Sequence, residues 1–143
     1  MATLAGVWCG AFGLRRASEV LDVNSRDDPL TLHQQALVLA DQAYIARRKG
    51  QVEAAIELAR KALGYEVEAA KRLPPVAGSE PTRSVLYLAA ASLAWQAKDY
   101  ELALELTAQG RTPWTPAEAL AEFDALERNV RLVLQTRMAK WDS

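Results

Sequence analysis

The chain has 143 residues and a mass of 15.7 kDa, the size of a single domain that buries a core of its own. Half of the residues are hydrophobic and 24% are charged, which is the composition of a folded globular protein rather than a disordered one. The formal net charge of -1 and the pI near 5.9 provide no electrostatic argument for binding to nucleic acid or to an anionic membrane.

The only cysteine, Cys9, excludes an internal disulfide and a cysteine-based zinc site, and it favours a reducing compartment. No apolar run approaches the roughly 20 residues that a membrane span requires. The N-terminal stretch is apolar, but Arg15 and Arg16 follow it instead of preceding it, unlike the charges of a secretory signal. We therefore expect a cytoplasmic protein that does not enter the membrane.

Residues 1–28 form an N-terminal tail or arm, and residues 29–143 form a helical domain. Gly6, Gly10 and Gly13 interrupt any helix in the tail, since an interior glycine costs about 1 kcal/mol relative to alanine. One interpretation is a disordered tail outside the native domain. The other is an arm whose apolar residues dock on this domain or on a neighbour.

Apolar residues recur at spacings of three and four along most of the domain, which predicts an all-α fold. The first helix begins after Asp28, whose carboxylate suits the N-cap, and Pro29 suits the next position. A proline-rich loop separates the second helix from the third, and the third is the most apolar, so we expect it in the middle of the fold. The predicted helices cover residues 30–49, 52–73, 82–98, 100–109 and 116–138.

The first four helices form two similar hairpins, residues 36–63 and 84–110. The first turns at Lys49-Gly50-Gln51, and the second turns at Lys98-Asp99-Tyr100. Alanines occupy the positions where the paired helices must touch, which lets the two backbones approach closely.

The repeated hairpin resembles the tetratricopeptide repeat, a helix–turn–helix of about 34 residues. The small residues of the family fall on Ala43, Ala55 and Ala62 in the first copy and on Ala91 and Ala103 in the second. The two turns lie farther apart than the family's period, which makes the second helix overlong and the proline-rich loop an insertion. The resemblance implies antiparallel hairpins stacked as a short right-handed superhelix, with the last helix as a C-terminal cap.

The resemblance also implies that a ligand lies against the concave face, which the first helix of each hairpin lines. Tyr44 and Trp95 would then anchor an apolar side chain, and Arg47 with Arg48 would hold a carboxylate. Alternatively, the two arginines only complement the helix dipole, and Trp95 belongs to the core. The positions expected on this face are Leu37, Ala40, Tyr44, Arg47, Arg48, Val85, Leu88, Ser92, Trp95 and Gln96.

The sequence offers little support for catalysis. His33 is the only histidine, and no nucleophile is fixed beside it. No His/Asp/Glu cluster has the spacing of metal ligands, and no glycine-rich phosphate loop is present. The paired carboxylates Glu66 and Glu68 are predicted to lie on the solvated surface of a helix. We expect no enzymatic activity, no catalytic residue, no metal and no cofactor.

The leading hypothesis is an adaptor or assembly module that binds a protein or peptide. A second hypothesis is a structural homo-oligomer, such as a homodimer, in which the third and fifth helices bury their apolar faces against a second copy. Nucleic-acid binding ranks lowest, because acidic residues share the helix that carries the basic C-terminal group. That group consists of Arg128, Arg131, Arg137 and Lys140 with Trp141.

Overall fold

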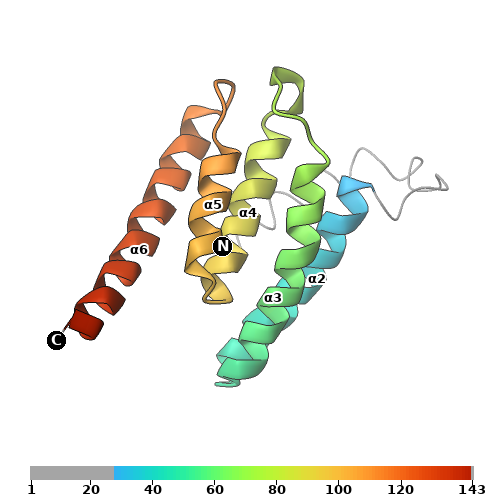
Figure 1. The fold of residues 1–143 in the computed structure, drawn as a ribbon. Coiled ribbons are helices and arrows are strands. Elements are labelled where there is room, and N and C mark those ends of the chain that lie inside the picture. Colours follow the sequence, from blue (N-terminus) through green and yellow to red (C-terminus); the bar gives the residue numbers. More distant parts are fainter. Residues whose placement is uncertain (1–27, 143) are drawn as a thin grey trace.

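The computed structural model describes residues 28–142, and the part of the chain it describes is all-α, as predicted. The tail interpretations and Cys9 fall outside these residues. The proline-rich loop contains a short 3-10 turn, η3 (Ala77–Ser79). The α-helices are α2 (Pro29–Arg48), α3 (Val52–Lys71), α4 (Thr82–Gln96), α5 (Tyr100–Gly110) and α6 (Ala117–Asp142) (Figure 1).

The helices lie side by side in chain order, and each runs antiparallel to the one before it (Figure 1). The hairpin of α2 and α3 has the most extensive contact. Helix α4 packs against α3, α5 and α6, so the prediction that the third helix lies in the middle is confirmed. Helix α6 packs against α5 and α4 through its first half, and its C-terminal half leans away from α5 (Figure 1).

Alanines dominate the interface between α2 and α3. Ala36 and Ala43 on α2 are fully buried, as are Ala59 and Ala62 on α3. A methyl group is the smallest side chain that fills such an interface without the conformational cost of glycine. As the sequence pattern predicted, helix α3 continues through Gly64. A Cβ at Gly64 would have open space around it.

The two hairpin turns have the same backbone geometry. Gly50 has a φ of 78°, and its N–H donates to Arg47 O at 3.0 Å, while the next N–H donates to Ala46 O at 2.9 Å. Lys98 has a φ of 62°, with the corresponding bonds to Trp95 O at 3.0 Å and to Ala94 O at 2.8 Å. Both turns are therefore Schellman motifs, in which a left-handed residue ends the helix. A lysine occupies the position that glycine favours in the second turn.

The ends of the helices differ in part from the predicted ones. Asp28 occupies the N-cap position of α2, but its carboxylate makes no capping hydrogen bond. The first turn of α4 is capped by Glu80, whose Oε1 accepts bonds from the Ser84 N–H at 3.1 Å and from the Ser84 hydroxyl at 2.6 Å. The last helix extends past the predicted end, to Asp142.

Helices α4, α5 and α6 meet at Gly110, the last residue of α5. A Cβ at this position would collide with the Phe123 ring and would approach Tyr87 Cβ to 2.9 Å. Arg83 is buried beside it and donates to Gly110 O at 3.2 Å and to Gln109 O at 3.0 Å. Its guanidinium lies 4.5 Å from the centre of the Tyr87 ring. This contact explains why glycine stands where the hairpin pattern would place an alanine.

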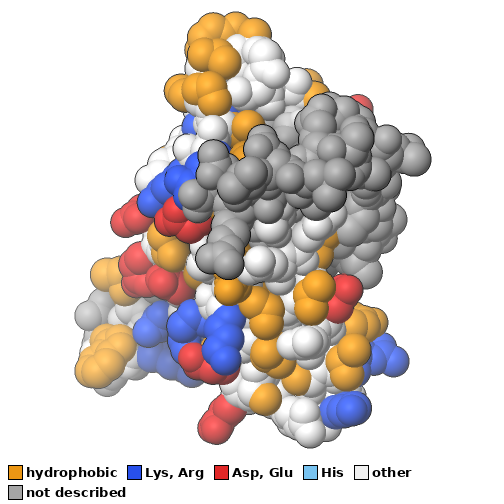
Figure 2. All heavy atoms as spheres, turned by 90° about the vertical axis from the view of Figure 1, so that its right-hand side faces the viewer, with side chains coloured by type: hydrophobic (Ala, Val, Ile, Leu, Met, Phe, Trp, Pro, Cys, Tyr) orange, Lys and Arg blue, Asp and Glu red, His pale blue; other side chains and the backbone are white. Residues whose placement is uncertain are grey.

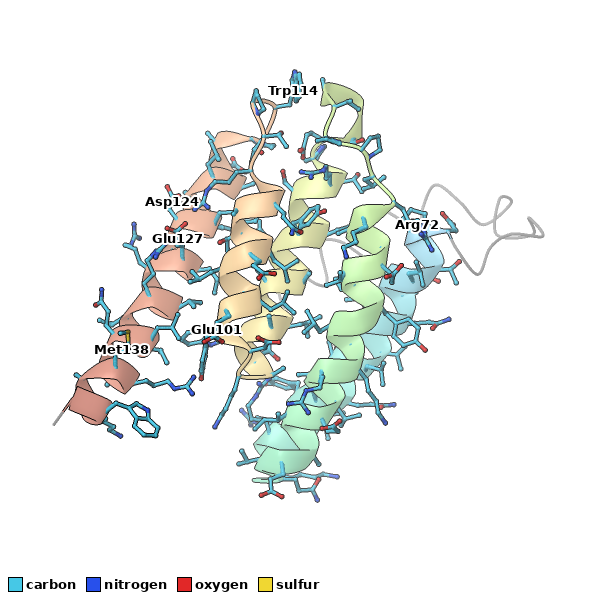
Figure 3. All side chains as sticks on the ribbon, in the orientation of Figure 1. Arg72, Glu101, Trp114, Asp124, Glu127 and Met138 are labelled. Atoms are coloured by element: carbon cyan, nitrogen blue, oxygen red, sulfur yellow. The ribbon has the colours of Figure 1, made fainter. Side chains whose placement is uncertain are left out.

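Arg111 joins the end of α5 to α6. Its Nη2 lies 2.9 Å from Asp124 Oδ1 and 2.8 Å from Glu127 Oε1 (Figure 3). The hydrogen bond from Arg131 to Glu127, together with Arg111, lowers the pKa of the Glu127 carboxyl below its usual 4.5, although burial opposes the shift. No helix in the described part of the chain combines the length and the hydropathy that crossing a bilayer requires.

Candidate functional site

A hydrogen bond joins the C-terminal ends of α2 and α4. Arg47 Nη1 and Nη2 each donate to Gln96 Oε1, at 3.3 Å. The contact is exposed, and the two residues are far apart in sequence. Two of the predicted binding residues, one from each hairpin, are therefore brought together.

Tyr44 and Arg48 lie beside this contact on α2. The Tyr44 side chain is 49% exposed, and the Arg48 guanidinium lies 6.0 Å from the centre of its ring. That separation is at the outer limit of a cation–π interaction, so the pair is held weakly. Both arginines also lie in the last turn of α2, where positive charge complements the helix dipole.

Trp95 extends the site from α4 to α5 and α6. It is half-buried, packs against the hydrophobic core, and meets the Tyr100 ring edge to face with centroids 5.4 Å apart. The Arg137 guanidinium of α6 lies 5.8 Å from the centre of the same Tyr100 ring. Trp95 thus packs against the core, as the alternative interpretation expected, and part of its side chain remains accessible.

The remaining predicted positions are less accessible. Ser92 lies one turn before Gln96 on α4 and is half-buried. Leu37, Ala40 and Val85 are half-buried as well. The prediction that Leu88 lies on the exposed face is wrong, because its side chain is buried in the core between α4 and its neighbours.

A separate open depression of about 380 Å³ lies on the α3 side of the first hairpin. It is lined by Leu32 of α2 and by α3 residues that include Lys61, Tyr65 and Glu68, with Arg72 at its end (Figure 3). None of the predicted binding residues lines it.

A buried ionisable pair connects α2 and α3. His33 Nδ1 is hydrogen-bonded to Glu66 Oε1 at 2.7 Å, and the two side chains are 2% and 1% exposed. The prediction that Glu66 is solvated is therefore wrong. Burial raises the pKa of the Glu66 carboxyl above its usual 4.5, although the hydrogen bond and the charge of His33 oppose the shift.

Nothing between residues 28 and 142 assembles the side chains of a metal site, since no group of three or more His, Cys, Asp or Glu residues converges there. Two of the basic residues of α6 have different neighbours. Arg131 is paired with Glu127 at 3.0 Å, whereas Arg137 is turned toward Tyr100.

The sequence pattern missed Tyr100 and Glu66 for different reasons. The sequence indicates only that Tyr100 belongs to the second turn, and the fold brings it into contact with Trp95 and Arg137. Glu66 continues the buried stripe of α3, since it lies four residues after Ala62, three after Leu63, and three and four before Ala69 and Ala70. That spacing was the available signal.

Comparison with protein-family models, with curated proteins and with solved structures finds no match to this chain.

Proposed function

We propose that the chain is a non-enzymatic binding module, a short tetratricopeptide-like stack that holds a protein or peptide against the ends of α2 and α4. In this proposal it acts as an adaptor or assembly factor in the cytoplasm. The main observation that supports this proposal is the hydrogen bond between Arg47 and Gln96. A guanidinium and an amide from separate hairpins meet on the surface beside the exposed Tyr44 ring, and aromatic and arginine side chains are common anchors of protein interfaces.

The hairpin architecture supports the proposal. Both hairpins turn through the same Schellman motif, and alanines line the first interface, as in a repeat of one structural unit. The first helices of the two hairpins, α2 and α4, approach each other at their C-terminal ends through Arg47 and Gln96, and a peptide would lie across these ends.

The test is copurification and crosslinking from cells of the source organism, with mass spectrometry of the captured proteins. We expect the double variant Tyr44→Ala/Gln96→Ala to lose a partner that the wild type retains. Tyr65→Ala is the matched control, because Tyr65 is also an exposed tyrosine and lies on α3, away from this surface. Circular dichroism checks that each variant is folded. Equal capture by the wild type and the double variant contradicts the proposal.

A second candidate is self-association through α6. Three large apolar side chains of this helix are exposed, Leu132, Met138 and Trp141, and Trp141 is 88% exposed (Met138 is labelled in Figure 3). The other helix expected in such an interface, α4, buries Leu86, Leu88 and Leu93 within the chain itself. Light scattering that finds a monomer at micromolar concentration excludes this candidate.

A further inference from the structure

Four contacts form a connected row across the ends of α2, α4, α5 and α6, which we call the arginine–aromatic strip. Arg48 lies over Tyr44, and its neighbour Arg47 donates to Gln96. Trp95, next to Gln96, packs on Tyr100, and Arg137 lies over the Tyr100 ring. Viewed from the α2 side, Lys and Arg side chains gather beside hydrophobic and acidic ones in the lower half of the molecule (Figure 2).

Within the described part of the chain, the arginines of the strip lack the carboxylate partner that most other surface arginines have, and Arg128 on α6 is the exception outside the strip. Arg60, Arg111 and Arg131 each pair with at least one carboxylate. Arg47, Arg48 and Arg137 form no ion pair with any residue from 28 to 142. Three guanidinium groups on one strip are thus left without the carboxylate that this side chain binds best.

The Arg47 contact has the form of an incomplete carboxylate site. Two N–H groups of its fork converge on a single neutral oxygen, and both distances are 3.3 Å. A carboxylate would offer one oxygen to each N–H, at the shorter distance of a charge-assisted bond. A carboxylate ligand therefore displaces Gln96 without leaving a buried group unpaired, because the contact is exposed.

We propose that the arginine–aromatic strip binds an acidic peptide segment, with carboxylates on Arg47 and Arg137 and an apolar side chain against Tyr44. This inference rests on the proposed function and specifies the chemistry of its partner. A polyanion such as nucleic acid fits less well, because its closely spaced phosphates need a continuous basic surface, which Asp99 and Glu101 on either side of Tyr100 interrupt (Glu101 is labelled in Figure 3). The carboxylate of Asp99 is also engaged in capping α5, through the Leu102 N–H at 3.3 Å.

The test uses fluorescence anisotropy with three labelled probes. They are a short peptide that alternates glutamate with leucine, a matched peptide that alternates lysine with leucine, and a short oligothymidylate. The variant is Arg47→Gln/Arg137→Gln, and the matched control is Arg60→Gln/Arg128→Gln, which removes the same charge. Arg60 lies on α3, and Arg128 lies nine positions before Arg137, on the opposite side of α6 at 100° per residue.

We expect the acidic peptide to bind the wild type, to lose about tenfold in affinity with the variant, and to keep its affinity with the control. Affinity should fall as salt is raised. Absence of acidic-peptide binding, equal binding of the basic peptide, tighter binding of oligothymidylate, or an equal loss in the control overturns the inference. If the acidic peptide fails but Tyr44→Ala/Gln96→Ala still loses a captured partner, the acidic chemistry is wrong and the proposed function stands.

Discussion

Gly110 lies against the Phe123 ring so closely that a single methyl group at this position would overlap it. Tyr87 closes the other side, so three helices meet at one residue that has no side chain. The position belongs to the core even though glycine contributes no apolar surface.

We expect Gly110→Ala to lower the free energy of unfolding by about 1–3 kcal/mol, the usual cost of overpacking a core. Gly64→Ala is the control, because Gly64 is helical, exposed and has nothing near its Cα. That substitution should raise the free energy of unfolding by up to about 1 kcal/mol. Urea denaturation of the two variants measures both values, and equal effects of the same sign would contradict the packing at Gly110.

The left-handed residues of the two turns provide a reciprocal pair of substitutions. Lys98→Gly should stabilise the fold by up to about 1 kcal/mol, because a side chain at a positive φ is strained. Gly50→Ala should destabilise it by a similar amount, since it introduces the same strain. Thermal melts followed by circular dichroism compare the two. Destabilisation by Lys98→Gly would mean that the lysine side chain contributes more than its backbone costs.

Arg83 replaces a solvent-exposed cap at the end of α5. It is buried and donates to two carbonyl groups that have no partner within the helix. We expect Arg83→Met to lower the free energy of unfolding by about 2 kcal/mol, because Gln109 O loses this donor and Gly110 O keeps the longer bond from the Thr115 hydroxyl, at 3.4 Å. Arg83→Lys should not restore it, since one ammonium does not reach both oxygens as a planar fork does.

The control for Arg83 is Arg60→Met, at an exposed arginine paired with Glu57. Its cost should stay within about 0.5 kcal/mol. A similar small cost for Arg83→Met would show that water replaces the guanidinium at the end of α5.

The Glu66 carboxyl should give the fold a distinct pH dependence. Its pKa in the folded chain is raised above 4.5 by burial, so the folded state holds this proton more tightly than the unfolded state. The free energy that the proton on Glu66 adds to folding is fully present below about pH 4.5, where the carboxyl is protonated in both states. It declines as pH rises through the raised pKa of the folded state and stays constant at higher pH. The difference in unfolding free energy between wild type and Glu66→Gln should therefore fall with pH in this window.

Chemical denaturation at a series of pH values measures that difference. Glu68→Gln is the control for removing one negative charge from α3, because Glu68 lies on the exposed side of the same helix. Parallel pH curves for wild type and Glu66→Gln would contradict the assignment.

The periodic spacing of apolar residues predicted the number, order and approximate ends of the helices in residues 28–142. It succeeded because each helix buries one stripe, and it placed α4 in the middle because that helix is apolar around most of its circumference. The equivalence of Gly50 and Lys98 was also readable, from the alanines that flank both turns.

The candidate site could be predicted only in part. Arg47 and Gln96 follow from their places in the two hairpins, but their contact depends on how the hairpins are stacked. Arg137 reaches Tyr100 because of the direction of α6, which no local pattern encodes. The prediction that Glu66 is exposed is wrong. A carboxylate is usually solvated, and no local pattern reveals that the partner of Glu66, His33, lies 33 residues away on another helix.

The buried pair of His33 and Glu66 has a consequence for how α2 and α3 align. An interface of alanines is nearly uniform along its length, so methyl groups alone would fit almost as well after a slip of one helical turn, about 5.4 Å. Such a slip would separate the His33 imidazole from the Glu66 carboxylate and break their hydrogen bond while both side chains stay buried, which is unfavourable. Only one register keeps the hydrogen bond between His33 and Glu66. These two polar residues therefore fix how α2 aligns with α3 along an interface of similar small side chains.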